Sequence, residues 1–285
     1  MKTAVITGAT SGIGLAVAKT LSQTGYAIIG IGRAQERCEA AKEQIASHTQ
    51  NAQVQFFCGD LAQQTDVNRL ADEIISHLNK NNDGKLDVLI NNAGGVRNWY
   101  TTTREGYETQ FALNHLAGFL LTYRLLPCLS RAHGKMILTG SDSHKNMKIR
   151  WNNIMFKKRY STLMAYKQSK LANLMFAKEF NDKLAASGVR AYVVDPGLVN
   201  TDIGSKGTTG FVSWFWSKRA KHGVHPGVSA QTYAYICTAP DATELYYHRC
   251  EPRSYSKNVD ITAETKRLWD LSERLCEIDY TEAIS

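Results

Sequence analysis

A tyrosine and a lysine stand four residues apart in the segment Ala165-Tyr-Lys-Gln-Ser-Lys170. On a helix, this spacing places the phenol of Tyr166 and the ammonium group of Lys170 on the same face. A fixed positive charge stabilises phenolate and so lowers the phenol's pKa from its ordinary value of about 10. The pair is therefore suited to passing a proton to or from a substrate oxygen near neutral pH.

A glycine-rich segment, Thr7-Gly-Ala-Thr-Ser-Gly-Ile-Gly14, follows the first apolar run of the chain. Gly8, Gly12 and Gly14 would let the backbone approach a pyrophosphate, whose charge the amino end of the next helix would face. The alternative is a turn that only permits tight packing. The order of this turn and the Tyr166–Lys170 pair favours a nicotinamide-dependent oxidoreductase.

Short apolar runs alternate along the chain with segments that carry apolar residues at intervals of three and four. The runs expected to be strands are Thr3–Thr7, Ala27–Ile31, Val54–Cys58, Val88–Asn91, Lys135–Thr139 and Arg190–Val194. The segments expected to be helices are Leu15–Thr24, Gln35–Ser47, Asp66–Asn79 and Ser169–Ala186. This alternation predicts an α/β fold, a Rossmann-type doubly wound parallel sheet with helices on both faces, and a cofactor at the carboxyl ends of the strands.

The bulk composition fits a single domain over residues 1–285, because a chain of 31.8 kDa with 43% hydrophobic residues can bury a full core. Six cysteines without a Cys-x-x-Cys pair predict neither a zinc site nor a disulfide framework.

The absence of an apolar leader and of a long apolar run predicts a cytoplasmic protein without a transmembrane anchor. The net charge of +8 is attributed to solubility and cofactor binding rather than to nucleic acid, because no nucleic-acid motif accompanies it. The choice between monomer and homo-oligomer stays open.

Two regions, 144–161 and 204–225, exceed what a minimal sheet needs, and we expect both to shape the substrate side. Four residues of the first region either line a pocket or form a small core beneath a loop: Trp151, Met155, Phe156 and Tyr160. The aromatic and basic segment Phe211–His222 is either a substrate lid or a weak contact with a membrane surface. From Asp260 onward, apolar spacing predicts an amphipathic helix packed on the body or on another subunit.

Seven landmarks in order resemble the short-chain dehydrogenase/reductase family. They are the glycine motif, Asp60-Leu61, Asn91-Asn-Ala-Gly94, Asn114, Ser141, Tyr166 with Lys170, and Asp195-Pro-Gly197. Two longer segments, Phe111–Thr122 and Ser169–Lys178, are similar to the branch that contains retinol dehydrogenases and WW-domain oxidoreductases.

The resemblance implies four catalytic residues. Tyr166 is expected to donate the proton, and Lys170 to tune that acid while binding the nicotinamide ribose. Ser141 is expected to hydrogen-bond the reacting oxygen; Ser143 is its rival, and we choose Ser141 because the strand should end just before it. Asn114 corresponds to an asparagine in a distorted helix that holds a water linked to the lysine, with a buried structural amide as the alternative.

The resemblance also implies the cofactor site. An acidic residue at the end of the second strand would accept hydrogen bonds from an unmodified ribose, whereas this chain has Gly32-Arg33 there, with Arg37 as a second basic candidate. Because Arg33 can contact a 2′-phosphate, we expect NADP(H). The expected cofactor-binding residues are Gly8, Thr10, Ser11, Gly12, Ile13, Gly14, Arg33, Asp60, Leu61, Asn92, Ala93, Gly94, Tyr166, Lys170, Pro196, Gly197, Val199 and Thr201, with no metal.

The expected activity is therefore hydride transfer between NADP(H) and a small-molecule carbonyl or alcohol, in the direction that reduces an apolar ketone or aldehyde. Two alternatives remain from the sequence. One is reduction of a carbon–carbon double bond on the same fold, and the other is a non-catalytic NADPH-binding sensor or scaffold.

Overall fold

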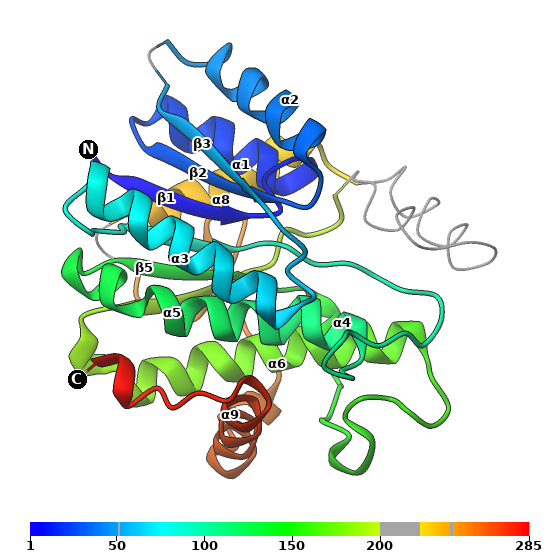
Figure 1. The fold of residues 1–285 in the computed structure, drawn as a ribbon. Helices are drawn as coiled ribbons and strands as arrows, with labels where there is room; N and C mark the ends of the chain where they lie inside the picture. Colours follow the sequence, from blue (N-terminus) through cyan, green and yellow to red (C-terminus); the bar gives the residue numbers. More distant parts are fainter. Residues whose placement is uncertain (51, 200–222, 240–241, 285) are drawn as a thin grey trace.

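The protein forms a mostly parallel sheet of eight strands between two layers of helices (Figure 1). The computed structural model describes residues 1–284 except 51, 200–222, 240 and 241. The strands are β1 Thr3–Thr7, β2 Ala27–Gly32, β3 Val54–Cys58, β4 Val88–Asn91, β5 Lys135–Thr139, β6 Arg190–Val194, β7 Tyr246–His248 and β8 Glu251–Pro252. Their spatial order is β3-β2-β1-β4-β5-β6-β7-β8, and only β8 runs antiparallel to its neighbour.

The chain order reverses between β1 and β4, which are hydrogen-bonded to each other in the middle of the sheet. In open α/β sheets, ligands bind beyond the carboxyl ends of the strands at such a switch point. The predicted doubly wound Rossmann-type fold is confirmed, and the six expected strands are all present with nearly the expected bounds.

Helices cover both faces of the sheet. Their bounds are α1 Gly12–Gln23, α2 Gln35–Ala46, α3 Gln64–Asn81, α4 Thr109–Phe111, α5 Ala117–Arg131, α6 Thr162–Lys183, α8 Pro226–Thr238 and α9 Thr262–Cys276. Helices α3, α5 and α6 lie on one face, with α9 against α6, whereas α1 contacts α2 and α8 on the other face (Figure 1). Successive residues of β1 enter different apolar clusters, Val5 with α3 and α5 and Ile6 with α1 and α8, because both faces are buried. None of the helices in the described ranges is long and apolar enough to cross a lipid bilayer.

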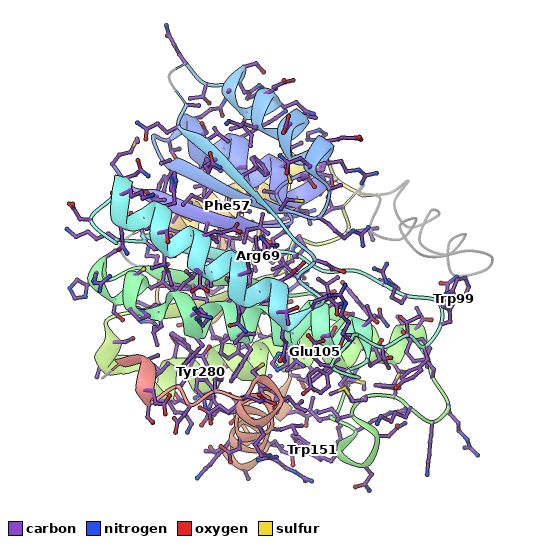
Figure 2. The ribbon with its side chains drawn as sticks, in the orientation of Figure 1. Phe57, Arg69, Trp99, Glu105, Trp151 and Tyr280 are labelled. Atoms are coloured by element: carbon purple, nitrogen blue, oxygen red, sulfur yellow. The ribbon has the colours of Figure 1, made fainter. Side chains whose placement is uncertain are left out.

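The carboxyl-terminal helix packs on the body of its own chain, which is one of the two arrangements that the sequence allowed. Leu268 and Trp269 of α9 are buried, and the Trp269 ring lies 5.3 Å from Phe119 of α5 and 4.6 Å from Tyr280, centroid to centroid. The Tyr280 hydroxyl donates to the Phe119 carbonyl at 2.7 Å. Figure 2 shows Tyr280 beside α6, whereas Trp99 lies at the periphery.

Replacing Trp269 with alanine should lower the free energy of unfolding by about 3 to 5 kcal/mol, because it removes a large ring from a closely packed aromatic cluster. Trp99→Ala is the matched control: its side chain is 56% exposed, so the change should stay within about 0.5 kcal/mol. Urea unfolding followed by circular dichroism measures both. Equal losses in the two variants would contradict the docking of α9.

Candidate active site

The glycine-rich turn joins β1 to the amino end of α1. Gly8 has a positive φ of 68°, which glycine adopts without strain. A Cβ on Gly14 would lie 2.3 Å from the Gly8 carbonyl oxygen, so only hydrogen fits there. Ser11, the residue before α1, makes no side-chain capping bond. The turn, which also holds Thr10 and Ile13, therefore presents backbone and a helix amino end where a phosphate can approach.

The remaining residues predicted for the adenosine end lie beyond β2 and β3. Arg33 directly follows β2 and is exposed. Asp60 and Leu61 follow β3, and the Asp60 carboxylate accepts the Ala62 amide at 3.2 Å, which is also what a structural turn residue would do. The structure thus brings these side chains to the same sheet edge as the glycine turn.

The loop after β4 is tied to the end of β1. The Asn92 side-chain amide donates to the Thr7 carbonyl at 3.0 Å, and the Ala93 backbone amide donates to Thr7 Oγ1 at 2.8 Å. A Cβ on Gly94 would lie 3.2 Å from Asn114 Oδ1 and 3.7 Å from Lys170 Nζ. Asn92, Ala93 and Gly94 therefore connect the cofactor turn with the predicted catalytic residues.

Asn114 lies in a five-residue π-helix, η1 Ala112–Leu116, between α4 and α5. Its Nδ2 donates to the Gly95 carbonyl at 3.1 Å and to Ser169 Oγ at 3.0 Å, and its Oδ1 accepts the Gly95 amide at 2.8 Å. The helix distortion implied by the resemblance is present. A single π-turn of this kind frequently marks a functional site.

Tyr166 and Lys170 both project from α6, and Lys170 Nζ lies 5.6 Å from the centre of the Tyr166 ring. Only 3% of Lys170 and 7% of Tyr166 is exposed. Lys170 Nζ donates to the carbonyl of Thr139, at the end of β5, at 2.8 Å. Burial lowers the pKa of Lys170 to about 8, and the nearby carboxylate of Asp195 opposes that decrease. A buried cation thus stands beside the phenol, as the spacing predicted.

Ser141 is the first residue beyond the pairing of β5 with β6, since the Gly140 amide still bonds the Val194 carbonyl at 2.7 Å. Its Oγ accepts the Ser143 amide at 3.2 Å. Its carbonyl accepts a hydrogen bond from His144 Nδ1 at 2.7 Å. The Ser143 hydroxyl is buried with no hydrogen-bonding partner among the described residues, so both serines remain candidates.

The Asp195-Pro-Gly197 segment follows β6 at the same edge. The buried Asp195 carboxylate accepts the Gly197 amide at 2.9 Å, and Pro196 accepts the Ser229 hydroxyl at 2.7 Å. Val199 forms a parallel bridge with Val224. Thr201, predicted to meet the nicotinamide end, lies outside the described residues, as does most of the 204–225 insertion.

Two side chains at this edge were missed by sequence reasoning. His248 Nδ1 donates to the Asp195 carbonyl at 2.9 Å, and Arg253 Nη1 lies 3.8 Å from Asp195 Oδ2. Both come from the region of β7 and β8, which are only three and two residues long. Such short strands have too little periodicity to be recognised.

The aromatic residues of the 144–161 insertion serve packing. Trp151 Nε1 donates to Glu264 of α9 at 2.7 Å, and the ring lies 4.2 Å from the guanidinium carbon of Arg267 (Figure 2). Met155 and Phe156 are buried in the main core. The Tyr160 hydroxyl donates to the buried carboxylate of Glu108 at 3.2 Å. These contacts support packing rather than a pocket lining, but the residues join the main core instead of forming the separate small core that the sequence suggested.

A buried histidine links the π-helix to the carboxyl-terminal helix. His115 is 1% exposed; its Nε2 lies 2.9 Å from Ser272 Oγ of α9, and its Nδ1 lies 3.4 Å from Asn173 Oδ1 of α6. Burial lowers the pKa of His115 to about 4. Because His115 directly follows Asn114, these contacts hold the π-helix from two sides.

The low pKa of His115 should make stability pH-dependent. Between pH 6.5 and about 4, the unfolded chain binds a proton on this side chain that the folded protein does not. The free energy of unfolding should therefore fall as the pH falls through that range, by about 3 kcal/mol in all. Urea midpoints measured at a series of pH values check this.

His115→Gln should flatten that pH dependence, whereas His48→Gln, at an exposed position, should keep the wild-type slope. Burial also lowers the pKa of His144, so a smaller slope of the same sign should persist in His115→Gln. An unchanged slope in His115→Gln would rule out His115 as its source.

Comparison with known proteins places the site in context. Residues 2–210 match the family model described as short chain dehydrogenase. Retinol dehydrogenase 12 of Mus musculus is 33% identical over 283 residues, which cover 98% of this chain and 87% of that protein. Retinol dehydrogenase 13 of Homo sapiens is 33% identical over 293 residues, covering 98% and 85%.

Solved structures agree with these sequence matches. An uncharacterised protein from Mycobacterium paratuberculosis has a TM-score of 0.75 and 29% identity, with 98% of this chain and 95% of that chain covered. An alcohol dehydrogenase from Thermococcus sibiricus, complexed with 5-hydroxy-NADP, has a TM-score of 0.67 at 21% identity, covering 90% and 100%. The second likeness concerns the fold alone.

Proposed function

The chain belongs to the short-chain dehydrogenase family, and we propose that it transfers a hydride between NADP(H) and a carbonyl or alcohol group of a small molecule. The observation that carries this proposal is the pairing of Tyr166 with the buried ammonium group of Lys170, at the sheet edge that also holds the glycine turn. When bound, the cofactor supplies or accepts the hydride at the substrate carbon.

Tyr166 donates the proton to the substrate oxygen in the proposed reaction. As a carbonyl is reduced, its oxygen gains negative charge and takes the phenolic proton. Lys170 stabilises the phenolate that remains, because an opposite charge acts strongly where water is excluded. A lysine whose pKa is about 8 remains largely charged at neutral pH, so this stabilisation is present under working conditions.

Ser141 and Asn114 support this acid. Ser141 directs its hydroxyl to the reacting oxygen, and Ser143 is the alternative donor. Asn114 supports a water that returns a proton to Lys170. A cavity of about 10 Å³, lined in part by Asn91 and Asn114, lies beside the π-helix, and Asn91 Oδ1 is buried without a partner among the described residues. That space suits one water molecule. Lys170 does not line this cavity, so the relay to Lys170 is proposed from the resemblance to the family.

NADP(H) is favoured over NAD(H) by Arg33. The residue directly follows β2, it is exposed, and the positions beside it are Gly32 and Ala34 rather than an acid. A guanidinium group can pair with the 2′-phosphate of NADP(H), whereas a carboxylate would repel it.

The substrate is an apolar ketone or aldehyde, and reduction is the cellular direction. The names of the relatives, retinol dehydrogenases, support chemistry at an alcohol or carbonyl, and the NADPH preference supports reduction. We place this activity in the cytoplasm, which cell fractionation can check.

Tyr166→Phe should lower kcat/KM for carbonyl reduction by about 1,000-fold, because it removes the proton donor and nothing else. NADPH binding, followed by fluorescence titration, should be retained. Tyr123→Phe, on α5 where the ring packs against Tyr280, is the matched control and should reduce carbonyls at the wild-type rate. Retained turnover in Tyr166→Phe, over a panel of aldehydes and ketones, would refute the proposed acid.

Arg33→Ala should raise the KM for NADPH by about 10- to 100-fold and leave the KM for NADH nearly unchanged, because only NADPH carries the phosphate that the guanidinium contacts. Lys42→Ala, an exposed basic residue farther along α2, serves as the control. Parallel losses with both cofactors would show that Arg33 does not select the phosphate.

A further inference from the structure

Two free cysteines meet at the end of β2. Cys58 is the last residue of β3 and pairs in register with Gly32, the last residue of β2. Paired residues on neighbouring strands point to the same face of a sheet. A Cβ on Gly32 would lie 2.5 Å from Cys38 Sγ, so the sulfur of Cys38, from α2, fills the space above Gly32. The Cys58 thiol is close enough to add to the effect of burial in raising the pKa of Cys38.

This thiol pair adjoins the proposed adenosine phosphate site. The Cys58 thiol donates to the Arg33 carbonyl at 3.1 Å. The methyl group of Thr10, in the glycine turn, would lie 2.4 Å from a Cβ on Gly32. A change at the Cys58 thiol therefore alters a hydrogen bond to the backbone of Arg33.

We propose that Cys38 and Cys58 form a reversible disulfide that weakens NADPH binding. A hydroperoxide oxidises the Cys58 thiol to a sulfenic acid and is itself reduced, hydrogen peroxide giving water. The Cys38 sulfur then attacks the sulfenic sulfur, the S–S bond forms and a second water leaves. The two thiols have lost two protons and two electrons in all, and an external thiol reductant returns them.

The burial of each thiol indicates which cysteine is oxidised first and which one then attacks. Cys58 is half-buried and reachable, so it meets the oxidant first, whereas Cys38 is 1% exposed and acts as the resolving thiol. Burial raises the pKa of Cys38 to about 11, and only the thiolate attacks, so closure of the disulfide should accelerate with rising pH. Once oxidised, Cys58 has no proton to donate, and the Arg33 carbonyl loses its hydrogen bond.

The test treats the purified full chain with hydrogen peroxide and maps unreduced peptides by mass spectrometry. We expect a peptide that joins Cys38 to Cys58, lighter by two hydrogen atoms than the two reduced peptides together. Affinity for NADPH should weaken by about fivefold, because the backbone that positions the Arg33 guanidinium loses its thiol donor, and dithiothreitol should restore it. Phenylarsine oxide, which binds two adjacent thiols, should block the cross-link by occupying both.

Cys58→Ser keeps a hydroxyl donor for the Arg33 carbonyl, so this variant should bind NADPH normally. Its NADPH affinity should not change after treatment with peroxide. Cys250→Ser, at another half-buried cysteine, should respond as the wild type does. Sulfenic or sulfinic acid on Cys58 without linkage to Cys38 would overturn the thiol pair. A cross-link without a change in NADPH affinity would overturn its regulatory effect. The regulatory effect rests on the proposed function. If the reduced protein binds no NADPH, the proposed function is refuted, whereas the cross-link between Cys38 and Cys58 can still be detected.

Discussion

Keeping an ammonium group charged inside the protein is the constraint on which the site depends. Removing a charge from water costs several kcal/mol unless partners compensate. For Lys170 these partners are the carbonyl of Thr139, the last residue of β5, and, at longer range, the carboxylate of Asp195, which follows β6. The loop after β4 closes over the same group at Gly94. Three neighbouring strands must therefore end in register before the lysine can be accommodated, so the chemistry is tied to the sheet.

The two halves of the sheet position different parts of the site. Strands β1 to β3, with α1, present backbone and a helix amino end at the proposed phosphate site. Strands β4 to β6, with α6, hold Tyr166, the proposed acid, and the cation of Lys170. Between them, the π-helix places Asn114 against α6, and the buried carboxylate of Glu108 caps the short helix that precedes it. The π-helix is thus supported at both ends by buried hydrogen bonds rather than by helix propensity.

The sequence predicted the features that depend on residues close together in the chain, but not the contacts that form through tertiary packing. Strands buried on both faces give continuous apolar runs, so the first six were found within about a residue, whereas β7 was too short to recognise. Tyr166 and Lys170 are four residues apart on one helix, and their meeting followed from spacing. His115 with Ser272, and Arg253 with Asp195, meet only through tertiary packing. Trp151 likewise gave no sign that its indole binds α9.

The contact between His115 and Ser272 spans 157 positions of the chain. During synthesis, strands β1 to β4 and the glycine turn leave the ribosome before α9 and can pair as they emerge. The hydrogen bond between His115 and Ser272 cannot form until α9 has been made. The half of the sheet that carries the glycine turn can therefore take shape before the half that carries Tyr166 and Lys170 reaches its final geometry.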